Sequence, residues 1–319
     1  MDTNEQQIPQ SIPPEEAITV PPAPKPRRSL IKRVFVSPDE PRLRAFWRLA
    51  IQFILMSMIL LLLGLALGWA STQGINIPVP SIASGQLLSL VSITLSIFLA
   101  RRLVDRRSFT SLGLKLDRHA LWDLLAGIGI AGLMMALIYL LHFIMGWASF
   151  AGYAWETASL PNLAINFTGL ILLFIIVGWQ EELSSRGYLL QNLADGLNLP
   201  WGVMLSSFLF SLLHLANPNA SWMSVLGILA AGLFLASGYI TTRQLWLPIG
   251  LHIGWNLFEG PVFGFPVSGL TFPSLIITQV QGPEWITGGA FGPEAGLILL
   301  PGIALGVTLI YLYTRNRLK

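Results

Sequence analysis

Apolar runs of about 20 residues recur along this chain, and they limit its fold more than any other feature of the sequence. An α-helix needs about 20 mostly apolar residues to cross roughly 30 Å of hydrocarbon. The 319 residues are 53% hydrophobic and 11% charged, whereas ordinary soluble chains are about 25% charged. The sequence therefore predicts an all-α fold, a polytopic membrane bundle with the lipid bilayer as its surroundings.

Eight transmembrane segments are predicted, and the charges that flank them indicate their orientation. Basic residues precede the first segment and follow the second, sixth and eighth, whereas the connections after the first and third segments contain none. By the positive-inside rule, this alternation predicts a multi-pass protein of the cell membrane with both termini cytoplasmic. The segments are residues 46–70, 84–100, 120–146, 163–183, 201–216, 223–241, 245–259 and 294–313.

Composition divides the chain into three parts. Residues 1–41 hold nine prolines among mostly polar neighbours and predict a disordered cytoplasmic tail. Residues 42–119 are two N-terminal transmembrane helices with a basic loop, and residues 120–319 form the core. The Gly- and Pro-rich connection 260–293 is interpreted equally well as a functional loop or as a surface cap.

Two classes of chemistry are excluded or disfavoured by composition. There is no cysteine, which excludes disulfides, a thiolate nucleophile and cysteine metal ligands. No basic stripe interleaved with aromatic residues is present, so no nucleic-acid partner is expected.

Ionisable residues inside membrane helices are costly, about 2.5–3.5 kcal/mol each, and so indicate function. The fourth segment ends in Glu181 and Glu182, with Arg186 one turn further on. Glu182 and Arg186 have the i,i+4 spacing of a helical ion pair. Glu181 lies about 100° further round the helix without such a partner, which makes it a candidate general base. The alternative is a solvated helix end.

His214, near the end of the fifth segment, is predicted to meet Glu181. The turn between the two helices is expected within residues 195–200. Counting 13 residues from each side of that turn reaches Glu181 and His214, so both lie about 20 Å from it at 1.5 Å per residue.

The seventh segment contributes a histidine and an amide on one helix face. His252 and Asn256 are spaced i,i+4, and Gly250 and Gly254 allow a neighbouring helix to approach closely. These polar groups are either interhelical hydrogen-bonding partners or parts of a site with Glu181. Because water must reach such a site, a polar cavity open to the cytoplasm is expected among the fourth to seventh segments.

The three motifs together resemble the CAAX protease and bacteriocin-processing (CPBP) family of intramembrane glutamic endopeptidases, which is related to type II CAAX prenyl endopeptidases. The resemblance covers about residues 120–310. It implies that Glu181 is the catalytic glutamate, that His214 helps it to activate water, and that His252 and Asn256 stabilise the oxyanion. Glu182, Arg186 and Phe210 would support the site.

One departure from the family pattern is Ser185, where many relatives carry a bulky aromatic residue.

The resemblance implies an enzyme that hydrolyses a peptide or membrane-proximal protein substrate without a cofactor or metal. Two alternatives stay open. A zinc-dependent membrane protease would also use two histidines and a glutamate, although the chain lacks His-Glu-x-x-His. A non-catalytic scaffold or immunity protein would use the same residues to hold the bundle together.

Overall fold

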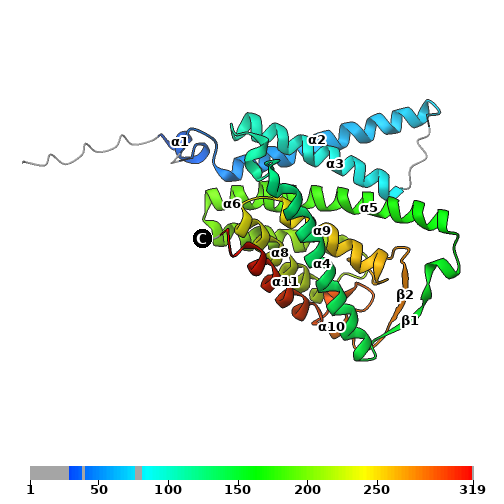
Figure 1. Ribbon diagram of the computed structural model, residues 1–319. Coiled ribbons are helices and arrows are strands. Elements are labelled where there is room, and N and C mark those ends of the chain that lie inside the picture. The colour runs from blue at the N-terminus through cyan, green and yellow to red at the C-terminus, as the bar shows by residue number, and fades with distance from the viewer. Residues whose placement is uncertain (1–28, 38–39, 76–80, 318–319) are drawn as a thin grey trace, which may run out of the picture.

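The computed structural model describes residues 29–37, 40–75 and 81–317. These residues form a bundle of helices with one short antiparallel ribbon (Figure 1), which confirms the predicted all-α membrane bundle. Six helical segments in the described ranges are long and apolar enough to cross a membrane: Ala45–Thr72, Ile82–Val104, Arg118–Ile144, Leu160–Gly196, Leu199–Ala216 and Trp222–Thr242.

The elements follow one another closely along the chain. The α-helices are α1 (Leu30–Phe35), α2 (Ala45–Thr72), α3 (Ser81–Leu99), α4 (Arg118–Ile144), α5 (Leu160–Glu182), α6 (Leu190–Gly196), α7 (Leu199–Leu213), α8 (Trp222–Thr242), α9 (Trp246–Leu257), α10 (Glu284–Thr287) and α11 (Leu299–Thr314). Three π-helical segments are η1 (Ala100–Val104), η4 (Leu183–Leu189) and η6 (Phe258–Val262). Single 3-10 turns are η2 (Phe109–Leu112), η3 (Ala154–Glu156), η5 (His214–Ala216) and η7 (Pro293–Ala295), and the strands are β1 (Ala148–Tyr153) and β2 (Ile276–Val280).

The two C-terminal predicted segments correspond to helices shorter than the six spans. Segment 245–259 is α9, with 12 residues, and segment 294–313 is α11, with 16 residues. All residues of α9 from Leu247 to Asn256 are buried, because α4, α5 and α8 pack around this helix. Since protein surrounds α9, its length need not match the thickness of the bilayer.

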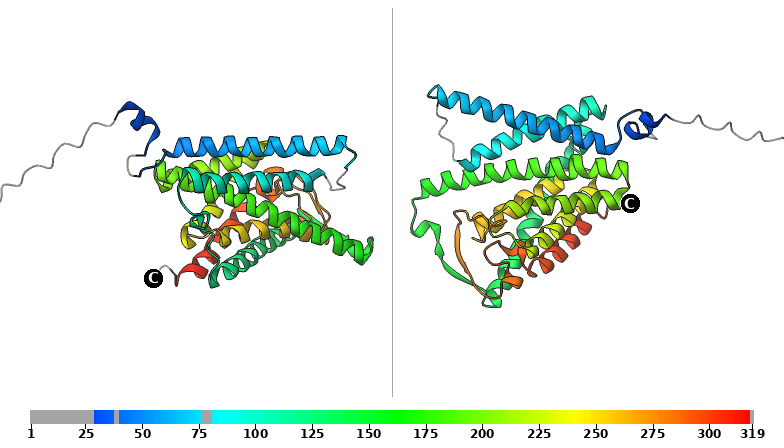
Figure 2. Two further views of the ribbon diagram at one scale, coloured as in Figure 1. Left: turned by 90° about the horizontal axis from the view of Figure 1, so that it is seen from above. Right: turned by 180° about the vertical axis from the view of Figure 1, so that it is seen from behind.

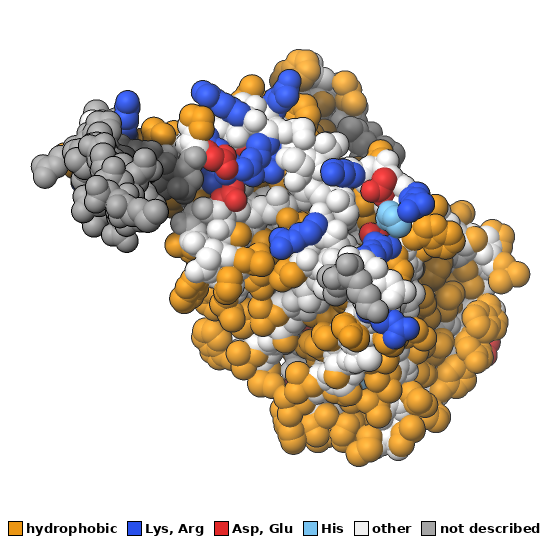
Figure 3. Space-filling view, turned by 60° about the vertical axis from the view of Figure 1, so that its left-hand side comes forward, with side chains coloured by type: hydrophobic (Ala, Val, Ile, Leu, Met, Phe, Trp, Pro, Cys, Tyr) orange, Lys and Arg blue, Asp and Glu red, His pale blue; other side chains and the backbone are white. Residues whose placement is uncertain are grey.

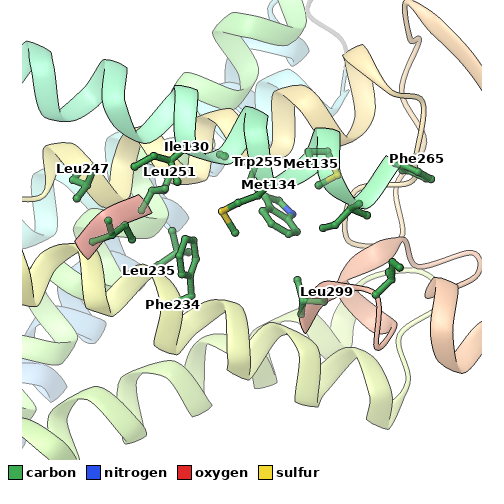
Figure 4. Packing of buried hydrophobic residues seen from close by; sticks show 14 residues of the cluster. Ile130, Met134, Met135, Phe234, Leu235, Leu247, Leu251, Trp255, Phe265 and Leu299 are labelled. Atoms are coloured by element: carbon green, nitrogen blue, oxygen red, sulfur yellow. The ribbon is translucent and has the colours of Figure 1, made fainter. Parts of the chain in front are cut away.

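Glycines allow α4 and α9 to touch backbone to backbone. A Cβ on Gly127 would lie 2.5 Å from the carbonyl oxygen of Leu247, and one on Gly250 would overlap the carbonyl oxygen of Leu124. Apolar side chains from α4, α8, α9 and α11, including Met134, meet beside this contact (Figure 4). The contact fixes the position of α9 at the centre of the bundle.

Replacing Gly250 with Ala is therefore expected to lower the free energy of unfolding by about 1–3 kcal/mol, because the backbones must separate to admit the methyl group. The measurement is denaturant unfolding of the detergent-solubilised protein. Gly129→Ala on α4 is the matched control: no atom lies within 4 Å of its added Cβ, so this change should be neutral or stabilising. Equal stability of the two variants would contradict the proposed role of Gly250.

Helices α2 and α3 form a layer on one side of α5, and α4, α8, α9 and α11 lie on the other side (Figures 1 and 2). Partly buried ion pairs join the N-terminal part of the chain to the end of α6. Arg42 Nη2 donates to Asp195 Oδ2 at 2.8 Å, and Arg48 Nη1 lies 3.4 Å from the same oxygen. The predicted parts 42–119 and 120–319 are thus connected by charge as well as by packing.

Basic side chains gather at one end of the molecule, and apolar side chains cover much of its flank (Figure 3). The two ends of the described chain lie at the same end of the bundle (Figure 1). Residues 1–28 of the predicted tail lie outside the described residues. Residues 30–35, which that prediction also covered, form α1.

The ribbon of β1 and β2 was not predicted. It pairs Ala148 with Val280 and Phe150 with Thr278 in antiparallel register. The pairing anchors the connection 260–293 to the chain that follows α4. As a result, residues 263–294 fold back against the helices instead of extending from them.

Candidate active site

Glu182 lies at the centre of a buried cluster of polar side chains at the end of α5. Its Oε1 accepts hydrogen bonds from Arg186 Nη1 at 2.7 Å and from His252 Nδ1 at 2.8 Å. Arg186 also donates from Nη2 to the carbonyl oxygen of Gly232 at 3.0 Å. The predicted i,i+4 ion pair therefore forms, and it additionally reaches across to α9.

The close approach of α5 to α9 brings the glutamates to the histidine. A Cβ on Gly178 would lie 2.6 Å from Ile253 Cγ1, so only glycine lets the two helices pack this tightly. Directly after Glu182 the helix widens into η4, and π-helical turns are frequent at functional sites. Arg186 lies in this π-helical segment, and its guanidinium group extends back to the carboxylate of Glu182.

Glu181 lies beside the other nitrogen of the same imidazole. Its Oε2 is 3.6 Å from His252 Nε2. The Glu181 side chain is 28% exposed, yet Oε2 itself is buried and has no hydrogen-bond partner among the described residues. His252 therefore joins the two adjacent glutamates, with Nδ1 on Glu182 and Nε2 facing Glu181.

His214 begins the turn η5 at the end of α7 and is half-buried. Its Nδ1 lies 2.8 Å from the carbonyl oxygen of Phe210. A carbonyl oxygen can only accept, so Nδ1 carries the hydrogen and Nε2 of the neutral ring is free to accept one. No hydrogen bond or ion pair joins His214 directly to Glu181 within the described chain.

Phe210 contacts three of the polar side chains through its ring. Arg186 Cζ lies 4.5 Å from the ring centroid, and the rings of His214 and His252 lie 4.7 and 6.2 Å away. An aromatic face beside a buried guanidinium is a favourable cation–π arrangement. Phe210 thus packs between the cation and both histidines.

Asn256 follows His252 by one turn of α9 and is 6% exposed. Its side chain makes no hydrogen bond to another described residue. It lines a cavity of about 360 Å³ together with Glu181, His214 and His252. All four predicted catalytic residues therefore face one space, which lies between α3, α5, α7, α8 and α9; its predicted opening to the cytoplasm stays a prediction. Ser185, the departure from the family pattern, lines the same space.

Two buried glutamates near this site were not predicted. Glu294, in η7, lines the cavity and is 4% exposed. Glu259, in η6, is fully buried, and neither of its carboxyl oxygens has a hydrogen-bond partner among the described residues. Burial raises the pKa of the Glu294 carboxyl, and hydrogen bonds from Ser268 oppose this shift, as do the imidazoles of His214 and His252.

The sequence held a signal for only one of these glutamates. Glu259 follows Asn256 by three residues and so continues the polar face of α9. Glu294 reaches the cavity through a connection of more than 30 residues, and no spacing rule relates it to the other groups.

No group of three or more His, Asp or Glu side chains within the described ranges is arranged to hold a metal ion. The arrangement as it stands offers a carboxylate, two imidazoles and an amide to one cavity. These groups can move protons and donate hydrogen bonds to a developing negative charge.

Comparison with known proteins gives one family match. Residues 163–258 match the family described as Type II CAAX prenyl endopeptidase Rce1-like. This confirms the family resemblance over a range narrower than the predicted 120–310, and it includes all seven predicted site residues. No match was found among curated proteins.

Proposed function

Because its central segment is that of a CAAX-type membrane protease, we propose that this chain is an intramembrane endopeptidase that uses Glu181 to activate water. One observation carries the proposal: Glu181, His214, His252 and Asn256 come from α5, η5 and α9 and face a single cavity. Polar groups that served only to join helices would be expected to pair with one another. Instead Glu181 Oε2 makes no hydrogen bond to another described residue, and the Glu181 side chain is 28% exposed, so water can reach its carboxyl group.

In the proposed reaction, Glu181 removes a proton from the water that attacks the scissile carbonyl carbon, and it gives this proton to the leaving amine nitrogen when the C–N bond breaks. His214 Nε2 accepts the second hydrogen of this water, which orients it. The carbonyl oxygen becomes negative and receives hydrogen bonds from Asn256 Nδ2 and from the imidazolium form of His252. Glu182 holds the His252 ring through Nδ1, and this second carboxylate positions the ring for that role.

The function is tested with the full-length protein in lipid vesicles or nanodiscs and a library of apolar peptides. We expect two product masses from each cut peptide that sum to the substrate mass plus one water. A parallel measurement with a chelator tests the zinc-dependent alternative. Loss of cleavage on chelation, with recovery when zinc is added, would favour a zinc protease. Binding of peptides without any products would favour the scaffold or immunity role.

Asn256→Ala is expected to reduce kcat by about 100- to 1,000-fold, the usual effect of removing one oxyanion donor. KM should change little, because Asn256 is proposed to act in the transition state. Steady-state cleavage of one library peptide measures both constants. Gln180→Ala, which changes another amide that lines the cavity, is the control and should keep most of kcat; equal losses in both variants would contradict the assigned role.

A further inference from the structure

The cavity proposed as the active site is acidic. Its lining includes the carboxyls of Glu181 and Glu294, and none of the described lining residues is Lys or Arg. Arg186 is buried behind it and pairs with Glu182 at 2.7 Å. The positive charge available to the cavity therefore comes from the imidazolium form of His252, which is assigned to the reaction, because the neutral His214 ring is assigned to accept a hydrogen bond.

Three hydrogen bonds fix the Glu294 carboxylate. Oε1 accepts from Trp255 Nε1 at 3.0 Å, and Oε2 accepts from the Ser268 backbone nitrogen at 2.8 Å and from Ser268 Oγ at 2.5 Å. The two N–H groups can only donate, so both oxygens must accept, which suits the ionised carboxylate. A carboxylate offers about four acceptor positions, so one of them stays open to a ligand.

The backbone that carries Glu294 is also held in place. η7 packs against α8 at Gly227, where an added Cβ would overlap the Glu294 carbonyl oxygen. Gly292, two residues before Glu294, has a backbone φ of 109°. Residues other than glycine rarely adopt this conformation. Because both the backbone and the carboxylate are fixed, the negative charge has a constant position in the cavity.

Apolar side chains of α3 and α5 also line the cavity. Ile82 and Ile93 of α3 and Leu173 and Val177 of α5 line it. A bound segment would therefore meet hydrocarbon on the α3 and α5 side and a carboxylate on the η7 side. A free C-terminal carboxylate at the η7 end would be repelled, whereas a cation there would gain a charge-assisted hydrogen bond.

We propose that Glu294 is a specificity-determining residue: it binds a Lys or Arg side chain of an otherwise apolar, membrane-proximal substrate segment, close to the bond that is cut. This inference rests on the proposed function, because it assigns the substrate class of the same cavity. Glu294 lies outside the residues that match the family, 163–258.

The test compares synthetic apolar peptides that carry Lys or its uncharged analogue norleucine at successive positions. With wild-type protein in nanodiscs, we expect kcat/KM to be about tenfold or more higher for Lys at one position near the cut. In Glu294→Gln this ratio should fall to about two or less, while the norleucine peptide is still cut. Glu284→Gln, an exposed carboxyl on α10, is the matched control and should keep the wild-type ratio.

Two further measurements separate the possible failures. If Glu294→Gln fails to fold, Ser268→Ala serves as a second variant. It removes the hydrogen bond from Ser268 Oγ but keeps the charge of Glu294, so it should retain the preference for Lys over norleucine. Fluorescence anisotropy with the non-cleaving Glu181→Gln protein measures binding of the same Lys and norleucine peptides. Equal binding and equal cleavage of the two peptides would overturn this inference alone, whereas Lys-selective binding without any wild-type cleavage would overturn only the proposed function.

Discussion

Replacing Glu181 with Gln is expected to lower peptide cleavage by at least about a thousandfold and to leave the stability of the protein almost unchanged. The amide cannot take a proton from water, and a positioned general base contributes about 100- to 10,000-fold. The stability should survive because Glu181 Oε2 makes no hydrogen bond to another described residue, and His252, which faces it, keeps its hydrogen bond to Glu182. Product mass spectrometry and thermal unfolding, measured on the same preparation, check both statements.

Glu156→Gln provides the matched control for this experiment. Glu156 is an exposed carboxyl in η3 and does not line the cavity, so this variant should cleave at the wild-type rate. Full cleavage by a folded Glu181→Gln protein would rule out a glutamate-dependent reaction. The cavity would then have to be explained as a binding site.

The sequence predicted those features of the fold that depend on neighbours along the chain. The apolar runs predicted the helices, and the i,i+4 spacing predicted the contact of Glu182 with Arg186. Equal counts from the turn placed Glu181 and His214 beside one cavity. Each of these predictions needs only the rise and the turn of a helix.

The contacts that depend on packing between distant helices could not be predicted. The position of His252 between Glu181 and Glu182 depends on how closely α9 approaches α5, which Gly178 and Ile253 determine. The position of Glu294 in the cavity depends on the packing of η7 against α8 at Gly227 and on hydrogen bonds from Trp255 and Ser268. A sequence pattern shows which face of one helix is polar, but not how far a second helix slides along it.

Removing the Glu182 carboxylate is expected to cost both stability and activity. In Glu182→Ala, the guanidinium of Arg186, 1% exposed, would keep only the carbonyl oxygen of Gly232 and the ring of Phe210 as partners. Breaking one side of a buried ion pair costs about 3–5 kcal/mol, because an uncompensated charge stays buried. Denaturant unfolding in detergent measures this loss.

A double variant separates the two effects of Glu182. Glu182→Leu combined with Arg186→Met replaces the buried charges with apolar groups of similar size, so most of the stability should return. Cleavage should stay low, because His252 Nδ1 has lost its acceptor and the ring is no longer held toward Glu181. Recovery of both stability and cleavage would show that Glu182 acts only through folding.

The second buried i,i+4 pair supplies the matched control. Arg101 Nη1 donates to Asp105 Oδ2 at 2.9 Å, and the Asp105 side chain is completely buried. This pair does not line the cavity, so Asp105→Ala should destabilise the protein about as much as Glu182→Ala does. Its kcat per folded molecule should nevertheless equal that of the wild type. Loss of a buried charge that only supports the fold should leave kcat per folded molecule unchanged. Loss of a charge that also orients a catalytic ring should lower it, and we expect this result for Glu182.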